Sequence, residues 1–454
     1  MLTLVMSKAA AGMTLAMPVL HPEKPGHVLL RPGCVLDDIA IGRLRELGVR
    51  RIAIEYPPTA FLMRYASMSL LNAQSRVAER IATELDAVSS GLHADFEMQT
   101  YVDGVRVLIQ HLVDEPAAAL FMNDIVDARP SVGSHAFNVG LLSLLVGLKL
   151  DGHLVSNKPR ITRRRQMNIE SLGLGAMLHD IGITRLPGTI GDRFDRTRNE
   201  DDEQWRKHVL VGFALVKGRL PATASAAVLH HHQRMDGSGF PTRTRGFGPP
   251  TALRGDEIHI FARIVGLADA FDRFRNPPAL VGADADAEKT RARNLGELHG
   301  GPVPTVRALK QTLELVRAGK LDPIVFKALL AVVPAFPPGS IVTISDGRTC
   351  VVTGWEPTQP CSPTVSVLPK SLEEAVAEGG TLTIRDADQL GEEIDLADRR
   401  DLRIVSIDGQ DVRADQFEPL CASEFDLRLS HPPPIGDGWD HIMEQTLAAG
   451  GKIG

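Results

Sequence analysis

Apolar residues recur at helical intervals through the middle of the chain, while short alternating runs are confined to its two ends. Between about residues 60 and 330, long runs follow the 3.6-residue period of an amphipathic helix, and strand signals are few. The run 259–274 is apolar on most faces, which is typical of a buried helix. The pattern therefore predicts a mainly α protein with small β-rich modules before and after the helical region.

The first of these modules is expected to cover residues 1–57. Short extended runs lie on either side of a charged turn that contains Pro and Gly, within 15–30. A helix is predicted over 37–49, where acidic residues open the run and a glycine closes it, and a strand follows at 51–54. Paired prolines then mark a boundary, and residues 58–124 are expected to be a helical linker region.

The C-terminal module is expected to cover residues 334–424. Two alternating runs within 340–355 are joined by Asp346–Gly347, which is a strong hairpin signal. Residues 425–454, rich in Pro and Gly, are expected to be a flexible tail. Further short strands are predicted at 364–367, 382–385 and 402–407.

Composition narrows the functional class. The chain has 454 residues, of which 43% are apolar and 23% charged, as in ordinary globular proteins with more than one domain. A net charge of −6 and only 5% aromatic residues argue against a general polynucleotide binder, so no DNA partner is expected. The apolar runs at the N-terminus and at 139–150 are too short for a secretory signal or a membrane span. We therefore expect a cytoplasmic protein without a membrane partner.

Candidate chemistry begins with the adjacent pair His179–Asp180, which follows an apolar helical run. Such a dipeptide occurs about once by chance in a chain of this composition. Its position is more informative, because a polar pair at the end of a buried helix must be hydrogen-bonded, paired or bound to a metal. An aspartate next to a histidine can bridge two metal ions while the imidazole binds one of them.

Other histidines and one aspartate share this kind of setting. His231 and His232 end an apolar run and precede a glycine-rich loop, where ligation is favoured over a structural role. His208 at a predicted helix start is, taken alone, more often a surface or capping residue. Asp269 within the buried run has a core salt bridge as its alternative explanation. Imidazoles and carboxylates without thiolates suit Fe, Mn or Zn in a mixed or octahedral site rather than structural zinc.

The sequence does not support an active site with a nucleophilic side chain or a phosphate-binding loop. The chain has no GxSxG motif, no P-loop and no GxGxxG after a strand. Two metal ions bridged by Asp180 would instead activate a water and stabilise the attacking and leaving oxygens of a phosphodiester.

The order of these motifs resembles the HD-GYP domain, a subgroup of the HD phosphohydrolases that hydrolyses cyclic di-GMP. The resemblance implies an HD-type helical bundle over residues 125–333. The flanking modules are also similar to segments found beside such domains. The matching segments are SHAF around His135, LHDIG at 178–182, KHVLVGFALV at 207–216, HHQRMDGSGFP at 231–241, RIVGLADAFDRF at 263–274 and GKLDPIVFKALL at 319–330.

Carried over to this sequence, the family implies a site for two divalent ions, usually iron or manganese. His179 and Asp180 are then the expected catalytic residues, and the products are pGpG and GMP. One ion is implied to bind His135, His179, Asp180 and Asp269, and the other Asp180, His208, His231 and His232.

The chain departs from the family where the substrate phosphate is held. Ile183 replaces the usual lysine after HDIG, and Arg185 is a candidate substitute cation. Gln233 replaces a glutamate and keeps only its hydrogen-bonding capacity. The usual arginine-rich segment is shortened, leaving Arg273 and Arg275 as candidate phosphate contacts.

Two further departures concern the metal site and the motif beside it. Phe240 replaces the tyrosine of GYP and lacks its hydroxyl group. Ser131 stands where some members have a glutamate for a third metal, so two metals are expected.

The expected function is a metal-dependent phosphodiesterase for cyclic di-GMP or a related cyclic dinucleotide. The first alternative is a weakly active or inactive regulator that binds a cyclic dinucleotide or protein partners, such as diguanylate-cyclase-type signalling proteins. The second is an HD phosphohydrolase for another nucleotide. The sequence does not fix the oligomeric state, although a dimer is compatible with it.

Overall fold

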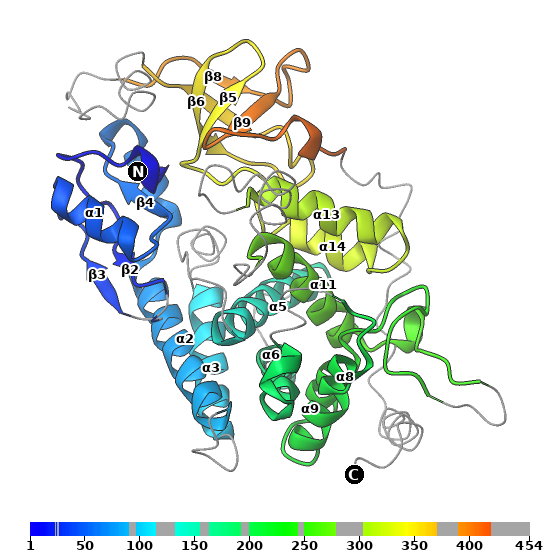
Figure 1. Ribbon diagram of the computed structural model, residues 1–454. Coiled ribbons are helices and arrows are strands. Elements are labelled where there is room, and N and C mark those ends of the chain that lie inside the picture. The colour runs from blue at the N-terminus through cyan, green and yellow to red at the C-terminus, as the bar shows by residue number, and fades with distance from the viewer. Residues whose placement is uncertain are drawn as a thin grey trace.

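The computed structural model is mainly helical, and the strands among its described residues lie toward its two ends (Figure 1). It describes residues 1–22, 24, 27–89, 97–114, 132–154, 163–191, 199–243, 249–277, 303–369 and 389–418. The expected fold class is therefore confirmed. Ser131, the predicted strand at 382–385 and the predicted tail lie outside the described residues. The domain limits stay predictions.

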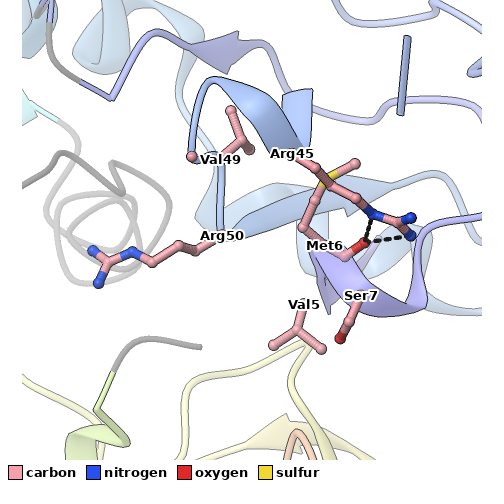
Figure 2. A pocket seen from close by; sticks show the side chains of 7 residues that line it. Val5, Met6, Ser7, Arg45, Val49 and Arg50 are labelled. Atoms are coloured by element: carbon pink, nitrogen blue, oxygen red, sulfur yellow. Dashed lines mark hydrogen bonds between the residues drawn. The ribbon is translucent and has the colours of Figure 1, made fainter. Parts of the chain in front are cut away.

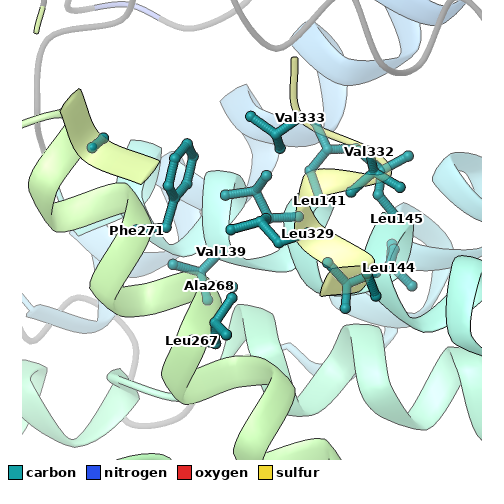
Figure 3. Packing of buried hydrophobic residues seen from close by; sticks show 14 of the residues in the cluster. Val139, Leu141, Leu144, Leu145, Leu267, Ala268, Phe271, Leu329, Val332 and Val333 are labelled. Atoms are coloured by element: carbon teal, nitrogen blue, oxygen red, sulfur yellow. The ribbon is translucent and has the colours of Figure 1, made fainter. Parts of the chain in front are cut away.

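The helical region is built around α5 (Val132–Leu154), which packs on α2 (Met68–Ser89), α6 (Arg163–Met177) and α11 (Ile260–Arg275). Figure 3 shows apolar side chains of α5 and α11 meeting those of α14 and the segment after it. Asp322 caps α14 through its side chain, directly before a proline at the first helical position. The remaining helical elements are α3 (Met98–Asp114), η3 (Ile181–Arg185), α8 (Glu203–Arg206), α9 (His208–Val216), α10 (Ala222–His230), η4 (Gly255–Glu257), α13 (Thr305–Arg317) and α14 (Pro323–Leu330).

One helix of this region has the length and composition of a membrane span. The stretch Gly133–Leu150 of α5 passes that test, but 72% of it is buried inside the protein. Its partners are other helices of the core, so its apolar character is explained by packing.

The N-terminal module pairs β1 (Leu2–Val5) with β4 (Arg51–Ile54) and β2 (Val19–Leu20) with β3 (Val28–Leu30), both antiparallel. The predicted helix is α1 (Asp38–Glu46), capped by the side chain of Asp37, and η1 (Met6–Lys8) and η2 (Pro57–Tyr65) complete the region. Strand β1 was not predicted, because four residues are too few to give a clear periodic pattern, and all four are buried. The predicted strand at 51–54 is β4.

A surface hollow lies in this module between η1 and the end of α1 (Figure 2). The guanidinium of Arg45 donates two hydrogen bonds to the carbonyl of Met6, at 3.2 and 3.3 Å. These bonds tie the last turn of α1 to η1. The hollow is lined by residues of the N-terminal module, and none of the candidate histidines lines it.

The C-terminal module is one antiparallel sheet with the strand order β10-β9-β5-β6-β7-β8. The predicted hairpin is confirmed, since Gly347 has a φ of +91° between the paired strands β5 and β6. Strands β8 and β10, with three and two residues, are too short to leave a sequence pattern. The strands are β5 (Ile341–Ile344), β6 (Thr349–Gly354), β7 (Thr364–Val367), β8 (Glu393–Asp395), β9 (Ile404–Ile407) and β10 (Gln410–Asp411), with η6 (Arg413–Asp415) after them.

The two β modules, far apart in sequence, pack against each other (Figure 1). The N–H of Thr3 donates to the carbonyl of Gly339 at 2.9 Å. Arg51 of β4 pairs with Asp408 at 2.6 Å, and both side chains are almost fully buried, at 6% and 5% exposure. Leu2 and Leu4 share a hydrophobic cluster with residues of the C-terminal sheet.

The Arg51–Asp408 pair gives a first prediction. Asp408→Asn is expected to lower the free energy of unfolding by about 3 kcal/mol, because it leaves a buried guanidinium without its charged partner. Asparagine also tolerates the φ of +52° at this position, so backbone strain does not confound the result. Denaturant unfolding measures the loss, and Arg51→Met combined with Asp408→Asn should cost less than the two single changes added together. Strict additivity would contradict the prediction.

Candidate metal centre

His179 and Asp180 lie in the turn between α6 and η3. Gly182 allows this turn to pack closely against α9. A Cβ atom on Gly182 would lie 2.0 Å from the carbonyl oxygen of His208 and 2.5 Å from the nitrogen of Gly212. Since both neighbours are backbone, no side-chain rotation could relieve the clash. Glycine at position 182 therefore allows Asp180 to approach His208.

A second glycine positions α11 against the end of α10. A Cβ atom on Gly266 would lie 2.3 Å from the carbonyl oxygen of His231. His231 and His232 directly follow α10, and Asp269 lies one turn beyond Gly266 on α11. The close approach of the two helices brings this aspartate toward the histidines.

Four of the predicted residues form one set of converging ligand atoms, here called the His208 group. All four are buried, and their ligand atoms lie within 4.8 Å of one another. Oδ1 of Asp180 is 3.2 Å from Nε2 of His208 and 3.5 Å from Nε2 of His231. The group consists of Asp180, His208, His231 and His232.

A second set shares Asp180 and is here called the His135 group. Nε2 of His135 is 3.0 Å from Oδ1 of Asp269, and Nε2 of His179 is 3.4 Å from Oδ2 of Asp180. Thus the two carboxylate oxygens of Asp180 face different groups. The set consists of His135, His179, Asp180 and Asp269.

Three of these histidines are oriented in the same way. Each ring places Nδ1 at hydrogen-bonding distance from the backbone carbonyl three residues earlier. With Nδ1 as the donor, the lone pair of Nε2 points into the centre. The distances are 2.7 Å for His179 to Ala176, 2.6 Å for His208 to Trp205 and 2.9 Å for His231 to Val228.

His135 uses a carboxylate instead. Its Nδ1 lies 2.7 Å from Oδ2 of Asp272, and the other oxygen of Asp272 accepts hydrogen bonds from Asn138 and Asn276, each at 2.9 Å. A carboxylate behind a ligating histidine fixes the tautomer and raises the basicity of the ring. Sequence reasoning missed Asp272, although its spacing of three from Asp269 places both on one face of α11.

Asp272→Asn is therefore expected to weaken metal binding by the His135 group about tenfold, because a neutral amide cannot raise the basicity of the His135 ring. Equilibrium dialysis against Mn²⁺ measures the affinity. Asn276→Ala is the matched control, since it removes a hydrogen bond to Asp272 and keeps the carboxylate charge. An unchanged affinity in Asp272→Asn would show that this carboxylate only supports the fold.

The electrostatics suit a cation. Burial acts to raise the pKa of the Asp180 carboxyl, but His179 and Arg273 hold that pKa well below its usual range. Burial lowers the pKa of His231 to about 4 and holds the pKa of His232 well below its usual value. Burial also acts to lower the pKa of His179, but Asp180 and Asp269 raise it to about 10. At neutral pH the centre therefore combines an ionised Asp180 with neutral imidazoles at His231 and His232.

The side chain of His232 bears on whether the centre fits a metal ion. Both ring nitrogens of His232 are buried and make no hydrogen bond with any described residue. The ring is held by Trp205, at 4.9 Å between centroids, and stacks on Phe240 at 4.6 Å. A buried imidazole without a hydrogen bond is costly unless it binds a ligand. The donor set and this orphaned ring fit a divalent metal ion.

The predicted phosphate contacts lie in different settings. Gln233 is buried, and its amide donates to the carbonyl of Pro241 at 2.6 Å and accepts from the N–H of Leu253 at 2.8 Å. Arg185 is exposed at the end of η3, whereas Arg275 is buried at the end of α11. Arg273 hydrogen-bonds to the carboxylates of Asp269 and Asp180 inside the centre.

Comparisons with known proteins agree with this geometry. Residues 160–287 match a family model described as an HD domain. The matched range contains the candidate ligands from His179 to Asp269, whereas His135 lies before it.

Curated relatives are phosphodiesterases. A cyclic di-GMP phosphodiesterase of Pseudomonas aeruginosa is 26% identical over 349 residues, covering 71% of this chain and 74% of that protein. A 3′3′-cGAMP-specific phosphodiesterase of Vibrio cholerae is 35% identical over 101 residues, covering 21% of this chain but only 17% of that protein. A solved HDG"Y"P protein from Bdellovibrio bacteriovorus aligns with a TM-score of 0.40 and 17% identity, over 72% of this chain and 97% of that one.

Proposed function

We propose that this chain, whose residues 160–287 match an HD domain, is a metal-dependent phosphodiesterase of the HD-GYP type that hydrolyses cyclic di-GMP to pGpG and GMP. The observation that carries the proposal is the position of Asp180. Its two oxygens face two groups of imidazole and carboxylate ligands, at 3.2 Å from His208 and 3.4 Å from His179. A carboxylate placed in this way suits a bridge between two metal ions.

Two divalent ions, iron or manganese, would be held by the His208 group and the His135 group, and would supply Lewis acidity and an activated water for attack at phosphorus. The residues of this chain orient the ligands and shield them from solvent. The carbonyls behind His179, His208 and His231 fix the rings, so little reorganisation is needed when a substrate binds. Burial of the ligands keeps solvent away from the carboxylates and strengthens their interaction with a cation.

The test is product formation from cyclic di-GMP by protein loaded with Fe²⁺ or Mn²⁺ under reducing conditions, followed by chromatography of nucleotides. Linear pGpG followed by GMP is the expected result. Running 3′3′-cGAMP and other nucleotides in parallel decides the substrate, because one partial match is to a phosphodiesterase named for 3′3′-cGAMP.

A non-catalytic regulator is the second candidate. The observations that favour it are the apolar Ile183 at the usual lysine position and the neutral Gln233 at the usual glutamate position. This reading predicts two bound metals and measurable cyclic dinucleotide binding without turnover. That outcome would replace the enzyme by the regulator.

A further inference from the structure

The guanidinium of Arg273 lies among the ligand atoms of the His135 group. Its Nε donates to Oδ1 of Asp269 at 2.5 Å, and its Nη2 donates to Oδ2 of Asp180 at 2.7 Å. The side chain is 16% exposed, and both carboxylates are 5% exposed. Helix geometry supports this position, since Arg273 follows Asp269 by one turn on α11.

The two hydrogen bonds use oxygens that a metal in the His135 group would need. Oδ1 of Asp269 is also 3.0 Å from Nε2 of His135, and Oδ2 of Asp180 is 3.4 Å from Nε2 of His179. The His208 group is served by the other oxygen of Asp180, Oδ1. Arg273 therefore engages the carboxylate oxygens of one group and leaves the oxygen that faces the other group.

The charge of Arg273, like its position, opposes the binding of a metal ion by the His135 group. Arginine presents a rigid, permanently charged fork that matches carboxylates and is weakly hydrated, so it is suited to a buried ion pair. Arginine is not deprotonated in proteins, so Arg273 keeps its positive charge beside Asp269 and Asp180. A metal ion entering the His135 group would meet this positive charge and would have to break both hydrogen bonds.

We propose that Arg273 competes with metal for the His135 group, so that the two groups differ in affinity and the His208 group fills first. The inference rests on the proposed two-metal function and adds an order of loading to it. Occupation of the His135 group then requires Arg273 to leave Asp269 and Asp180. Because both charge-assisted hydrogen bonds must break, the two affinities should differ by at least about tenfold.

Titration of metal-free full-length protein with Mn²⁺ tests the proposal, using calorimetry for affinity and electron paramagnetic resonance to separate single ions from coupled pairs. The wild-type protein is expected to bind one ion tightly and a second at least about tenfold more weakly. Arg273→Met keeps the length of the side chain and removes its charge. It should tighten the second site about ten- to a hundredfold, so that the coupled-pair signal appears at lower Mn²⁺ concentration.

Two control variants separate competition from general charge effects. Arg206→Met removes a cation that lies 4.8 Å from the centroid of the Phe240 ring and hydrogen-bonds to the Glu200 carbonyl and to Asp201, so the second affinity should not change. Arg273→Lys keeps the charge without the planar fork and should give an intermediate affinity. If Arg273→Met does not fold, as judged by circular dichroism, Arg273→Lys carries the same comparison.

The outcomes distinguish this proposal from the one on which it rests. Two ions of equal affinity in the wild-type protein, or a second affinity that does not change in the Arg273 variants, would overturn the competition while leaving the two-metal enzyme intact. Failure of wild-type protein to bind Mn²⁺ at all would overturn the proposed metal centre itself.

Discussion

Asp180→Ala is expected to abolish phosphodiesterase activity, with a loss of at least about a thousandfold, and to lower the metal content of both groups together. The reason is the shared position of this carboxylate. Oδ1 lies 3.2 Å from Nε2 of His208, and Oδ2 lies 3.4 Å from Nε2 of His179. Removing one side chain therefore takes a ligand from each group at once.

Elemental analysis of protein dialysed against Mn²⁺ and a cyclic di-GMP assay measure the two losses. Asp256→Ala is the matched control, because this aspartate is 91% exposed and lies outside both groups. It should retain metal and activity. If Asp180→Ala keeps one ion at full affinity, Asp180 belongs to a single group and does not bridge.

The residue types of the centre could be predicted in part from the sequence, because His179–Asp180 and His231–His232 each end an apolar run. His179, His208 and His231 were expected to converge, and the structure brings them together. The orienting carbonyls could not be predicted, since any helix offers a carbonyl three residues before a side chain. Their use depends on the ring rotamer, which tertiary packing determines.

The other features that the sequence did not predict depend on contacts between residues that are far apart in the chain. Helical spacing places Arg273 next to Asp269, but its bond to Asp180 joins residues 93 positions apart. Gln233 was considered a substrate contact, and the structure shows its amide bonded to backbone groups of Pro241 and Leu253. Likewise, β1 depends on pairing with β4, and such pairing leaves little trace in a run of four residues.

Ile183→Lys is expected to raise kcat/KM for cyclic di-GMP about ten- to a hundredfold, because it restores a cation beside the centre. The position favours such contact. Residue 183 lies in η3, and its N–H donates to the carbonyl of Asp180 at 2.9 Å, so it is one turn from the shared carboxylate. The Ile183 side chain is half-buried, which leaves a longer chain a route toward solvent and substrate. A charge-assisted hydrogen bond to phosphate is worth about 1.5–3 kcal/mol.

Steady-state kinetics of Ile183→Lys and Ile183→Met separates charge from size. Methionine matches much of the length of lysine without its charge, so it should leave kcat/KM near the wild-type value. An equal gain in both variants would assign the effect to packing. No gain with lysine would mean that another cation already holds the phosphate, and adding Arg185→Ala to each variant would then reveal whether Arg185 is that cation. In that case Arg185→Ala alone should lower kcat/KM, and Ile183→Lys should restore it.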